Sequence, residues 1–102
     1  MAQTEIRLVV ERFGQRIRSI VSPRMIVLFG SHARNAASPA SDIDIAIVVD
    51  RVVGDYLDTR IALYKARREI DIRIEPLLIE SERDAGGFLE SILAQGEIIY
   101  QA

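Results

Sequence analysis

The sequence has 102 residues, of which 49% are hydrophobic and 27% are charged, and its formal net charge at neutral pH is −2. This length and composition suit one folded domain over residues 1–102 and exclude a disordered chain, while the lack of cysteine excludes disulfides and thiolate metal sites. There is no signal-peptide pattern, no apolar run near the about 20 residues of a membrane span and no basic stripe, which predicts a cytoplasmic protein that binds neither membranes nor nucleic acid directly.

The first predicted elements are a helix and a buried strand. Apolar residues recur at spacings of three and four from Gln3 to Val21, which predicts an amphipathic helix that ends before Pro23. Residues 25–29 have no polar side chain on either face. They therefore predict a central strand that is covered on both sides.

A second strand and a second helix are predicted next. Isoleucines alternate with other residues over 43–49, as in a strand with one face toward a core. Asp55 is a suitable N-cap for a helix that continues to Arg68. The apolar stripe of this helix consists of Leu57, Ile61 and Tyr64. Leu63 lies off this stripe, as it would in a broad buried face or on a partner surface.

Residues 69–75 show the most regular alternation in the chain, with isoleucines on one face and charged residues on the other. They predict a half-covered strand that is ended by Pro76. A further helix closed by Gly96 and a short strand over 97–100 complete the order. This order predicts an α/β (α+β) fold, in which helices pack on a small mixed β-sheet mainly on the face that receives the isoleucines.

The loop between the first two strands holds the strongest candidates for a functional site. Gly30 and Ser31 follow the first strand, where glycine takes backbone angles closed to other residues and consecutive N–H groups beside a hydroxyl can bind a phosphate. Asp42 and Asp44 leave one face of the second strand, about 6.6 Å apart by the strand rise. Two carboxylates held side by side attract a cation.

Each of these features alone also has an ordinary structural explanation. An Asp-x-Asp pair can be the solvated start of a strand, and Gly-Ser is a common loop dipeptide. Asp71 would by itself belong to a solvent-facing row of mixed charges on the strand over 69–75. Together, hard carboxylate oxygens and a phosphate-sized turn on adjacent strand ends are what Mg²⁺-assisted phosphoryl transfer requires.

The spacing of these residues carries a family resemblance. Gly30-Ser31, ten residues and then Asp42-Ile43-Asp44 resemble the signature of the DNA polymerase β-like nucleotidyltransferases, and the short chain resembles their minimal nucleotidyltransferase (MNT) group. Ile70-Asp71-Ile72 resembles the strand that carries the family's third carboxylate, and residues 96–100 resemble the closing segment of MNT proteins. Asn35 stands where many relatives have glycine. The resemblance implies the polymerase β-like nucleotidyltransferase core.

The resemblance also implies roles for individual residues. Asp42 and Asp44 would hold the metal ions that contact the triphosphate, and Asp71 would help hold the catalytic metal and activate the acceptor hydroxyl. The implied nucleotide-binding residues are Gly30, Ser31 and Arg34. The implied cofactor is Mg²⁺ or Mn²⁺, with ATP as the nucleotide donor.

A single domain of this size offers no lobe that would hold an acceptor, so the acceptor must bring its own surface. The resemblance to MNT proteins implies that AMP moves from ATP to a tyrosine of a HEPN-domain ribonuclease toxin, which makes the chain an antitoxin. Two alternatives are a non-catalytic antitoxin that neutralises the toxin by binding, and a nucleotidyl-transfer subunit that acts on a small molecule. The acceptor, the base preference and the homo- or hetero-oligomeric state are left open.

Overall fold

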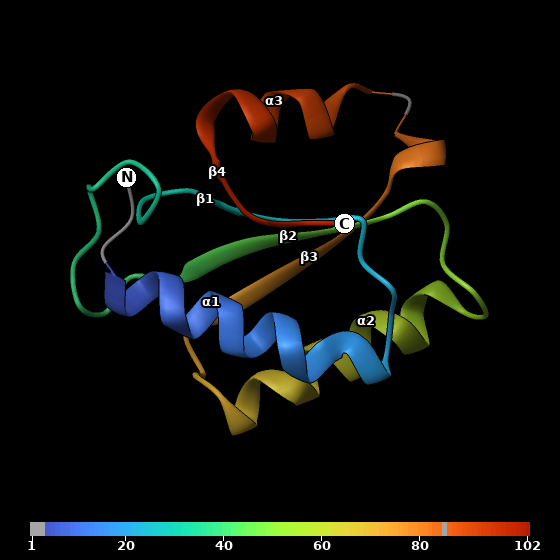
Figure 1. The fold of residues 1–102 in the computed structure, drawn as a ribbon, viewed down its shortest axis with the longest axis horizontal. Coiled ribbons are helices and arrows are strands. Elements are labelled where there is room, and N and C mark those ends of the chain that lie inside the picture. The colour runs from blue at the N-terminus through green and yellow to red at the C-terminus, as the bar shows by residue number, and fades with distance from the viewer. Residues whose placement is uncertain (1–3, 85) are drawn as a thin grey trace.

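The computed structural model describes residues 4–84 and 86–102, in which helices and strands follow one another in the predicted order (Figure 1). The α-helices and strands are α1 (Thr4–Arg16), β1 (Met25–Phe29), β2 (Ile43–Val49), α2 (Tyr56–Ala66), β3 (Ile74–Glu80), α3 (Phe88–Gln95) and β4 (Glu97–Gln101). Short 3₁₀ turns follow α1 and α2 and precede α3, namely η1 (Ile17–Ser19), η2 (Arg67–Glu69) and η3 (Ser81–Arg83).

The strands form one mixed sheet in the order β3-β2-β1-β4. β1 is antiparallel to both β2 and β4, whereas β2 and β3 are parallel and are joined through α2. In this register Asp44 lies opposite Phe29 on one side and opposite Glu75 on the other. The predicted small mixed sheet is confirmed.

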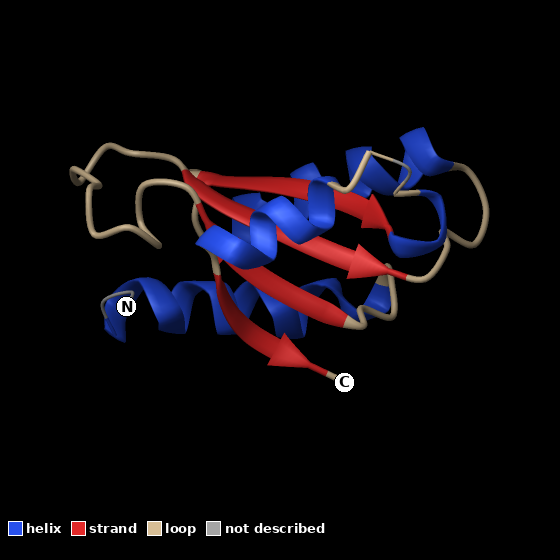
Figure 2. Cartoon of the chain, turned by 90° about the horizontal axis from the view of Figure 1, so that it is seen from above, coloured by secondary structure: helices blue, strands red, loops and turns tan. Residues whose placement is uncertain are grey.

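The sheet has helices on both faces, with two of them on one face (Figures 1 and 2). α1 and α2 cover the face that receives the isoleucines of β2, and α3 covers the opposite face, where Ala46 and Ile79 meet Ile92. The predicted packing of helices mainly on the isoleucine face is therefore confirmed. The larger core on that face consists of Ile6, Val10, Phe13, Ile17, Ile26, Leu28, Ile43, Ile45, Ile47, Val49, Leu63, Ala66, Ile74 and Leu78.

The predicted apolar stripe of α2 does not face the sheet. Leu63 and Ala66 are the buried residues of this helix, while Leu57 is 58% exposed and Ile61 is 45% exposed. Asp55 does cap the helix, since its carboxylate accepts a hydrogen bond from the N–H of Asp58. The helix has apolar residues on two sides, so their spacing alone could not indicate which side would be buried.

The predicted strand over 69–75, ended by Pro76, is wrong: β3 begins at Ile74 and includes Pro76. The N–H of Ile43 donates to the carbonyl of Arg73, so the backbone N–H and C=O groups of alternate β3 residues point toward β2 and the backbone nitrogen of Pro76 points away from it. A proline is tolerated there because the N–H that it lacks has no partner strand.

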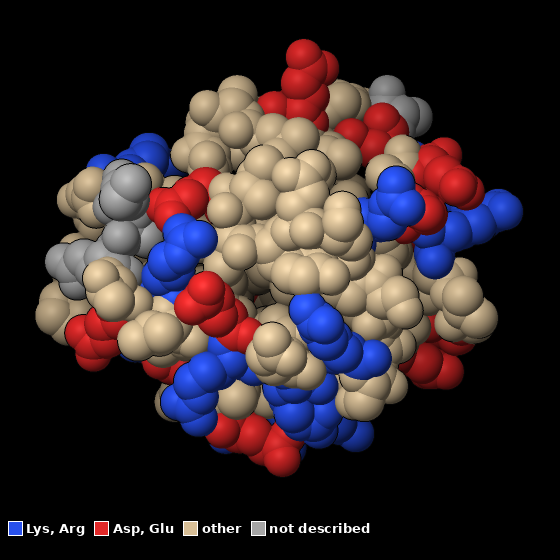
Figure 3. All heavy atoms as spheres, viewed as in Figure 1, with Lys and Arg blue, Asp and Glu red and all other residues tan. Residues whose placement is uncertain are grey.

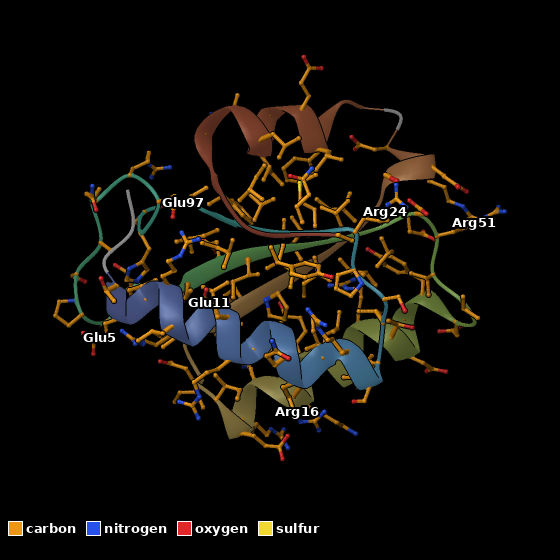
Figure 4. All side chains as sticks on the ribbon, viewed as in Figure 1. Glu5, Glu11, Arg16, Arg24, Arg51 and Glu97 are labelled. Atoms are coloured by element: carbon orange, nitrogen blue, oxygen red, sulfur yellow. The ribbon has the colours of Figure 1, made fainter. Side chains whose placement is uncertain are left out.

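Ion pairs attach α1 to its surroundings at both ends. Arg7 pairs with Glu97 of β4 at 2.5 Å, and Arg16 pairs with Glu69 of η2 (Figure 4). On the face shown in Figure 3, acidic and basic side chains are interspersed around a broad uncharged area. No helix of the described residues has the length and apolar character needed to cross a membrane.

Candidate functional site

The loop between β1 and β2 extends beyond the end of the sheet and begins with a sharp turn (Figure 2). Gly30 has φ 74°, and a Cβ added there would lie 2.2 Å from Oδ2 of Asp44. Only glycine leaves room for the carboxylate in this position. The turn is continued by hydrogen bonds from the N–H groups of Arg34 and Ala36 to the carbonyl of Ser31, at 3.2 and 2.9 Å.

Asn35 also has a left-handed backbone, with φ 56°. Asparagine tolerates this conformation better than most residues with a side chain. The position at which many relatives have glycine therefore keeps the glycine-like backbone in this chain.

Asp44 is brought to the end of the sheet by β2, and Asp42 precedes it in the loop. Asp44 is half-buried and lies on the face of the sheet that α3 covers, because side chains alternate along the strand. Burial raises the pKa of the Asp44 carboxyl above its ordinary value, and the nearby charges of Asp42 and Glu75 raise it further. A cation at this position would relieve the repulsion among these acids.

Glu75 is the acidic residue that the sequence analysis missed. It lies directly across from Asp44 on the neighbouring parallel strand. The hydroxyl of Tyr64 donates to its Oε2 at 3.0 Å, and Nη1 of Arg67 lies 3.4 Å from its Oε1. The Arg67 guanidinium also lies 5.1 Å from the centre of the Tyr64 ring, so Tyr64 of α2 and Arg67 of η2 together hold this carboxylate at the edge of the sheet.

A signal for Glu75 is present in the sequence. It is the second residue of β3, as Asp44 is the second residue of β2, and each follows an isoleucine. Asp71 and Glu75 lie on the same face of the alternation over 69–75, so the pattern alone does not distinguish them. Only the placement of the strand at 74–80 shows that Glu75 has the position that corresponds to Asp44.

Asp71 lies before β3 and binds Arg73. Its two oxygens accept hydrogen bonds from the guanidinium at 3.1 and 2.8 Å, and Oδ1 also accepts from the backbone N–H of Arg73 at 2.9 Å. These hydrogen bonds from Arg73 lower the pKa of the Asp71 carboxyl below its ordinary value. Arg73 in turn donates to the carbonyl of Pro39 at 3.0 Å, so Asp71 helps to fix the loop.

The loop also encloses a hollow beside the first turn of α1. Its volume is ≈ 290 Å³, and it is lined by Glu5, Ile6, His32, Asn35, Ala37, Ser38, Pro39 and Arg73. Nε2 of His32 lies 3.4 Å from the carbonyl of Ser41. The positive charge of the exposed Arg34 acts on Asp44 in the opposite sense from its acidic neighbours and offsets a part of the rise in its pKa.

The donor set suits a hard divalent cation, although the side chains are not gathered around one point. Among residues 4–84 and 86–102, no three His, Cys, Asp or Glu side chains are grouped so as to hold a metal ion. Asp42 and Asp44 nevertheless supply carboxylate oxygens, which Mg²⁺ prefers, usually through one or two carboxylates and the phosphates of a substrate. The pKa of Asp44 is raised first by burial and then by the negative charges of Asp42 and Glu75, and a cation would balance these charges.

Comparison with known proteins assigns this arrangement to a family. The sequence profile of the family described as "Polymerase beta, Nucleotidyltransferase" matches residues 15–102. Among curated proteins, none matches the sequence significantly.

Solved structures share the fold. A chain from the complex of tri-AMPylated Shewanella oneidensis HEPN toxin with MNT antitoxin superposes with a TM-score of 0.67 and 20% identity, over 95% of this chain and 73% of that chain. A toxin–antitoxin structure with AMP-PNP gives 0.70 and 20%, over 94% and 73%. A putative nucleotidyltransferase from Sulfolobus solfataricus gives 0.67 and 17%, over 95% and 81%. The TM-scores establish a common fold at low sequence identity, while function depends on the site.

Proposed function

This chain belongs to the polymerase beta family of nucleotidyltransferases, and we propose that it transfers AMP from ATP to a tyrosine hydroxyl of a HEPN-type toxin and thereby acts as an antitoxin. The observation that carries the proposal is the Asp42 and Asp44 pair beside the left-handed turn at Gly30. Similar structures that contain an AMPylated HEPN toxin or AMP-PNP support the choice of acceptor and of nucleotide.

Different residues of this chain would bind the nucleotide and the cation and accept the proton. The turn at Gly30 and Ser31 presents backbone N–H groups to the phosphates, and Asp42 and Asp44 would hold the divalent cation. Such a cation, when bound, supplies charge stabilisation to the attacking and leaving oxygens. The acceptor oxygen forms a bond to the α-phosphorus as the bond to pyrophosphate breaks, and a carboxylate of the site accepts the proton of the acceptor hydroxyl.

We assign the third carboxylate to Glu75 rather than to Asp71. Glu75 lies opposite Asp44 in the sheet, and its guanidinium partner Arg67 is 3.4 Å away. Both oxygens of Asp71 instead accept closer hydrogen bonds from the Arg73 guanidinium, at 3.1 and 2.8 Å. A carboxylate bonded to its own neighbour is a poor base, since hydrogen bonding to the charged form lowers its pKa. Tyr64 and Arg67 would orient the Glu75 carboxylate, as outer partners do for the ligands of a metal site.

Two conservative variants separate these assignments. Glu75→Gln is expected to lower the rate of transfer by about 100-fold or more, as removal of a positioned base does, with nucleotide affinity largely kept because Asp42 and Asp44 remain. Asp71→Asn is expected to retain most of the rate and to lower the melting temperature, because Arg73 loses its partner. Mass detection of AMP on the acceptor, run beside thermal melts, gives both results.

The opposite pattern would restore Asp71 to the role that the family resemblance implies. A rate that collapses in Asp71→Asn while Glu75→Gln stays active would contradict the assignment to Glu75. The variant Tyr64→Phe, which removes only one hydrogen bond to Glu75, is a graded control between these extremes.

Nucleotide binding is expected to require Mg²⁺ or Mn²⁺ and to weaken at acid pH. The carboxylates and the triphosphate repel one another until a cation lies between them. Because the pKa of Asp44 is raised, protonation competes with the cation at a higher pH than it would for an ordinary aspartate. The test is calorimetric titration with ATP in the presence of Mg²⁺ or of a chelator, repeated from neutral to acid pH. Equal ATP affinity with Mg²⁺ and with chelator would contradict the prediction.

A binding-only antitoxin is the second candidate, because similar solved structures hold a toxin together with its antitoxin, and an antitoxin can act by occupying the toxin. The decisive test is a toxin that is co-expressed with Asp42→Asn. Transfer as the mechanism predicts that this variant still forms the complex but leaves the toxin unmodified and active. Full protection by the variant at normal expression would instead support neutralisation by binding alone.

A further inference from the structure

The outward side of α2 carries an apolar row that no other described residue covers. Leu57 and Ile61 are both largely exposed, and with Tyr64 they repeat at spacings of four and three residues, which places them on one side of the helix. A surface hollow of ≈ 300 Å³, here called the α2 groove, lies along this side. It is lined by Leu57, Arg60, Ile61, Tyr64, Lys65, Arg67 and Arg68.

The rim of the α2 groove is positively charged, although the whole chain is slightly negative. Arg67 bonds to Glu75, but Arg60, Lys65 and Arg68 form no ion pair with any residue that the structure describes. The ion pair between Arg16 and Glu69 involves no residue of the groove lining. The groove therefore offers apolar contact flanked by uncompensated cations.

The α2 groove adjoins the candidate active site through two side chains, Tyr64 and Arg67. Both line the groove; the hydroxyl of Tyr64 and the guanidinium of Arg67 donate to Glu75, which lies opposite Asp44. A partner that is seated on α2 would thus lie along the flank of β3, next to the carboxylates.

We propose that the α2 groove docks an amphipathic helix of the acceptor protein, with apolar residues against Leu57 and Ile61 and acidic residues against Arg60 and Arg68. A row at spacings of four and three residues matches the apolar face of a helix, and exposed apolar rows rimmed by charge mark protein-binding surfaces. That the partner is the acceptor rests on the proposed function; the docking itself does not.

Charge argues against a second copy of this chain as the occupant. Two α2 grooves that faced each other would bring Arg60, Lys65 and Arg68 against the same cations of the other copy. Like charges juxtaposed across an interface oppose association. An acidic helix satisfies the same groove without that cost.

Two synthetic peptides test the proposal on the intact protein. One is an amphipathic helix with leucines at the spacing of the α2 row and glutamates on its flanks; the other has lysine in place of every glutamate. Amide NMR shifts are expected to change over residues 57–68 with the glutamate peptide. The lysine peptide is expected to bind at least about tenfold more weakly, the sum of a few surface ion pairs.

Protein variants then assign the binding to the groove. The double variant Leu57→Gln and Ile61→Gln should weaken the glutamate peptide about tenfold, as expected when buried apolar contacts are lost. Leu8→Gln on α1, where Leu8 is 54% exposed, is the matched control and should bind as the unaltered chain does. Reversing two charges, with Arg60→Glu and Arg68→Glu, should make the protein prefer the lysine peptide.

Three results would overturn the proposal. These are equal binding of the two peptides, undiminished binding by the Leu57→Gln and Ile61→Gln variant, and a dimer of the chain that this variant dissociates. Asp42→Asn should bind the glutamate peptide normally even though it is expected to transfer no AMP. A failure of the docking proposal is thereby distinguished from a failure of the proposed function.

Discussion

Asp44→Asn is expected to abolish AMP transfer while leaving the fold intact. The substitution removes a carboxylate that would hold the cation on the triphosphate, and the loss of one charge-stabilising group of an active site costs about 10²–10³ in rate. Asp44 is half-buried near the start of β2 and is not a member of either hydrophobic core cluster. The measurement is mass-detected AMP on the acceptor, with the melting temperature as the control for folding.

The same variant is expected to be as stable as the unaltered chain or more stable at neutral pH. The folded state raises the pKa of Asp44 above its ordinary value of 3.8, so the folded state binds this proton more tightly than the unfolded state does. Ionised Asp44 therefore destabilises the fold as the pH rises through and above 3.8, and the advantage of asparagine should vanish below that pH. A loss comparable to a core truncation, about 2–5 kcal/mol, would instead mark Asp44 as structural.

Gly30→Ala should have the second largest effect, because it acts on Asp44 through the backbone. A methyl group at position 30 would lie 2.2 Å from Oδ2 of Asp44, so the carboxylate or the turn must move. A left-handed backbone adds about 1–2 kcal/mol of strain for a residue with a side chain. We expect nucleotide affinity and transfer both to fall by at least about tenfold, which a displaced metal-holding group readily costs.

Gly54→Ala is the matched control for this substitution. Gly54 also has a positive φ, of 95°, but a Cβ at this position meets nothing within 4 Å. It should therefore report the strain of the left-handed backbone alone, with a lower melting temperature and unchanged ATP affinity. Equal losses of ATP affinity in the two alanine variants would show that the contact of Gly30 with Asp44 is not what matters.

The sequence predicted β1 and β2 to the residue because each has a single pattern. Residues 25–29 are apolar throughout, and the alternation over 43–49 runs between two polar loops. The family spacing from Gly30 to Asp44 then located the loop and its carboxylates without any knowledge of the sheet. The local sequence pattern was sufficient to predict the position of a residue wherever a single strand or loop determines that position.

The position of Glu75 could not be obtained in this way. It depends on the pairing of β2 with β3, which brings together Asp44 and Glu75 although they lie 31 residues apart along the chain. The alternation over 69–75 also continues through the turn before β3, which moved the expected strand toward the N-terminus. In α2, the pair Leu63 and Ala66 and the pair Leu57 and Ile61 are both apolar, so the sequence of the helix does not show which pair is buried. Packing against the sheet buries Leu63 and Ala66.

Pro76 has a consequence for aggregation. An exposed edge strand is a template on which strands of other molecules can add, and β3 forms one edge of this sheet. Because the nitrogen of Pro76 points outward and carries no hydrogen, the row of backbone donors on that edge is interrupted at the third of the seven residues of β3. At the other edge, β4 is five residues long and its pairing with β1 shifts between Ile26 and Val27. Both edges therefore resist the growth of intermolecular sheets at the high local concentrations in which newly made chains fold.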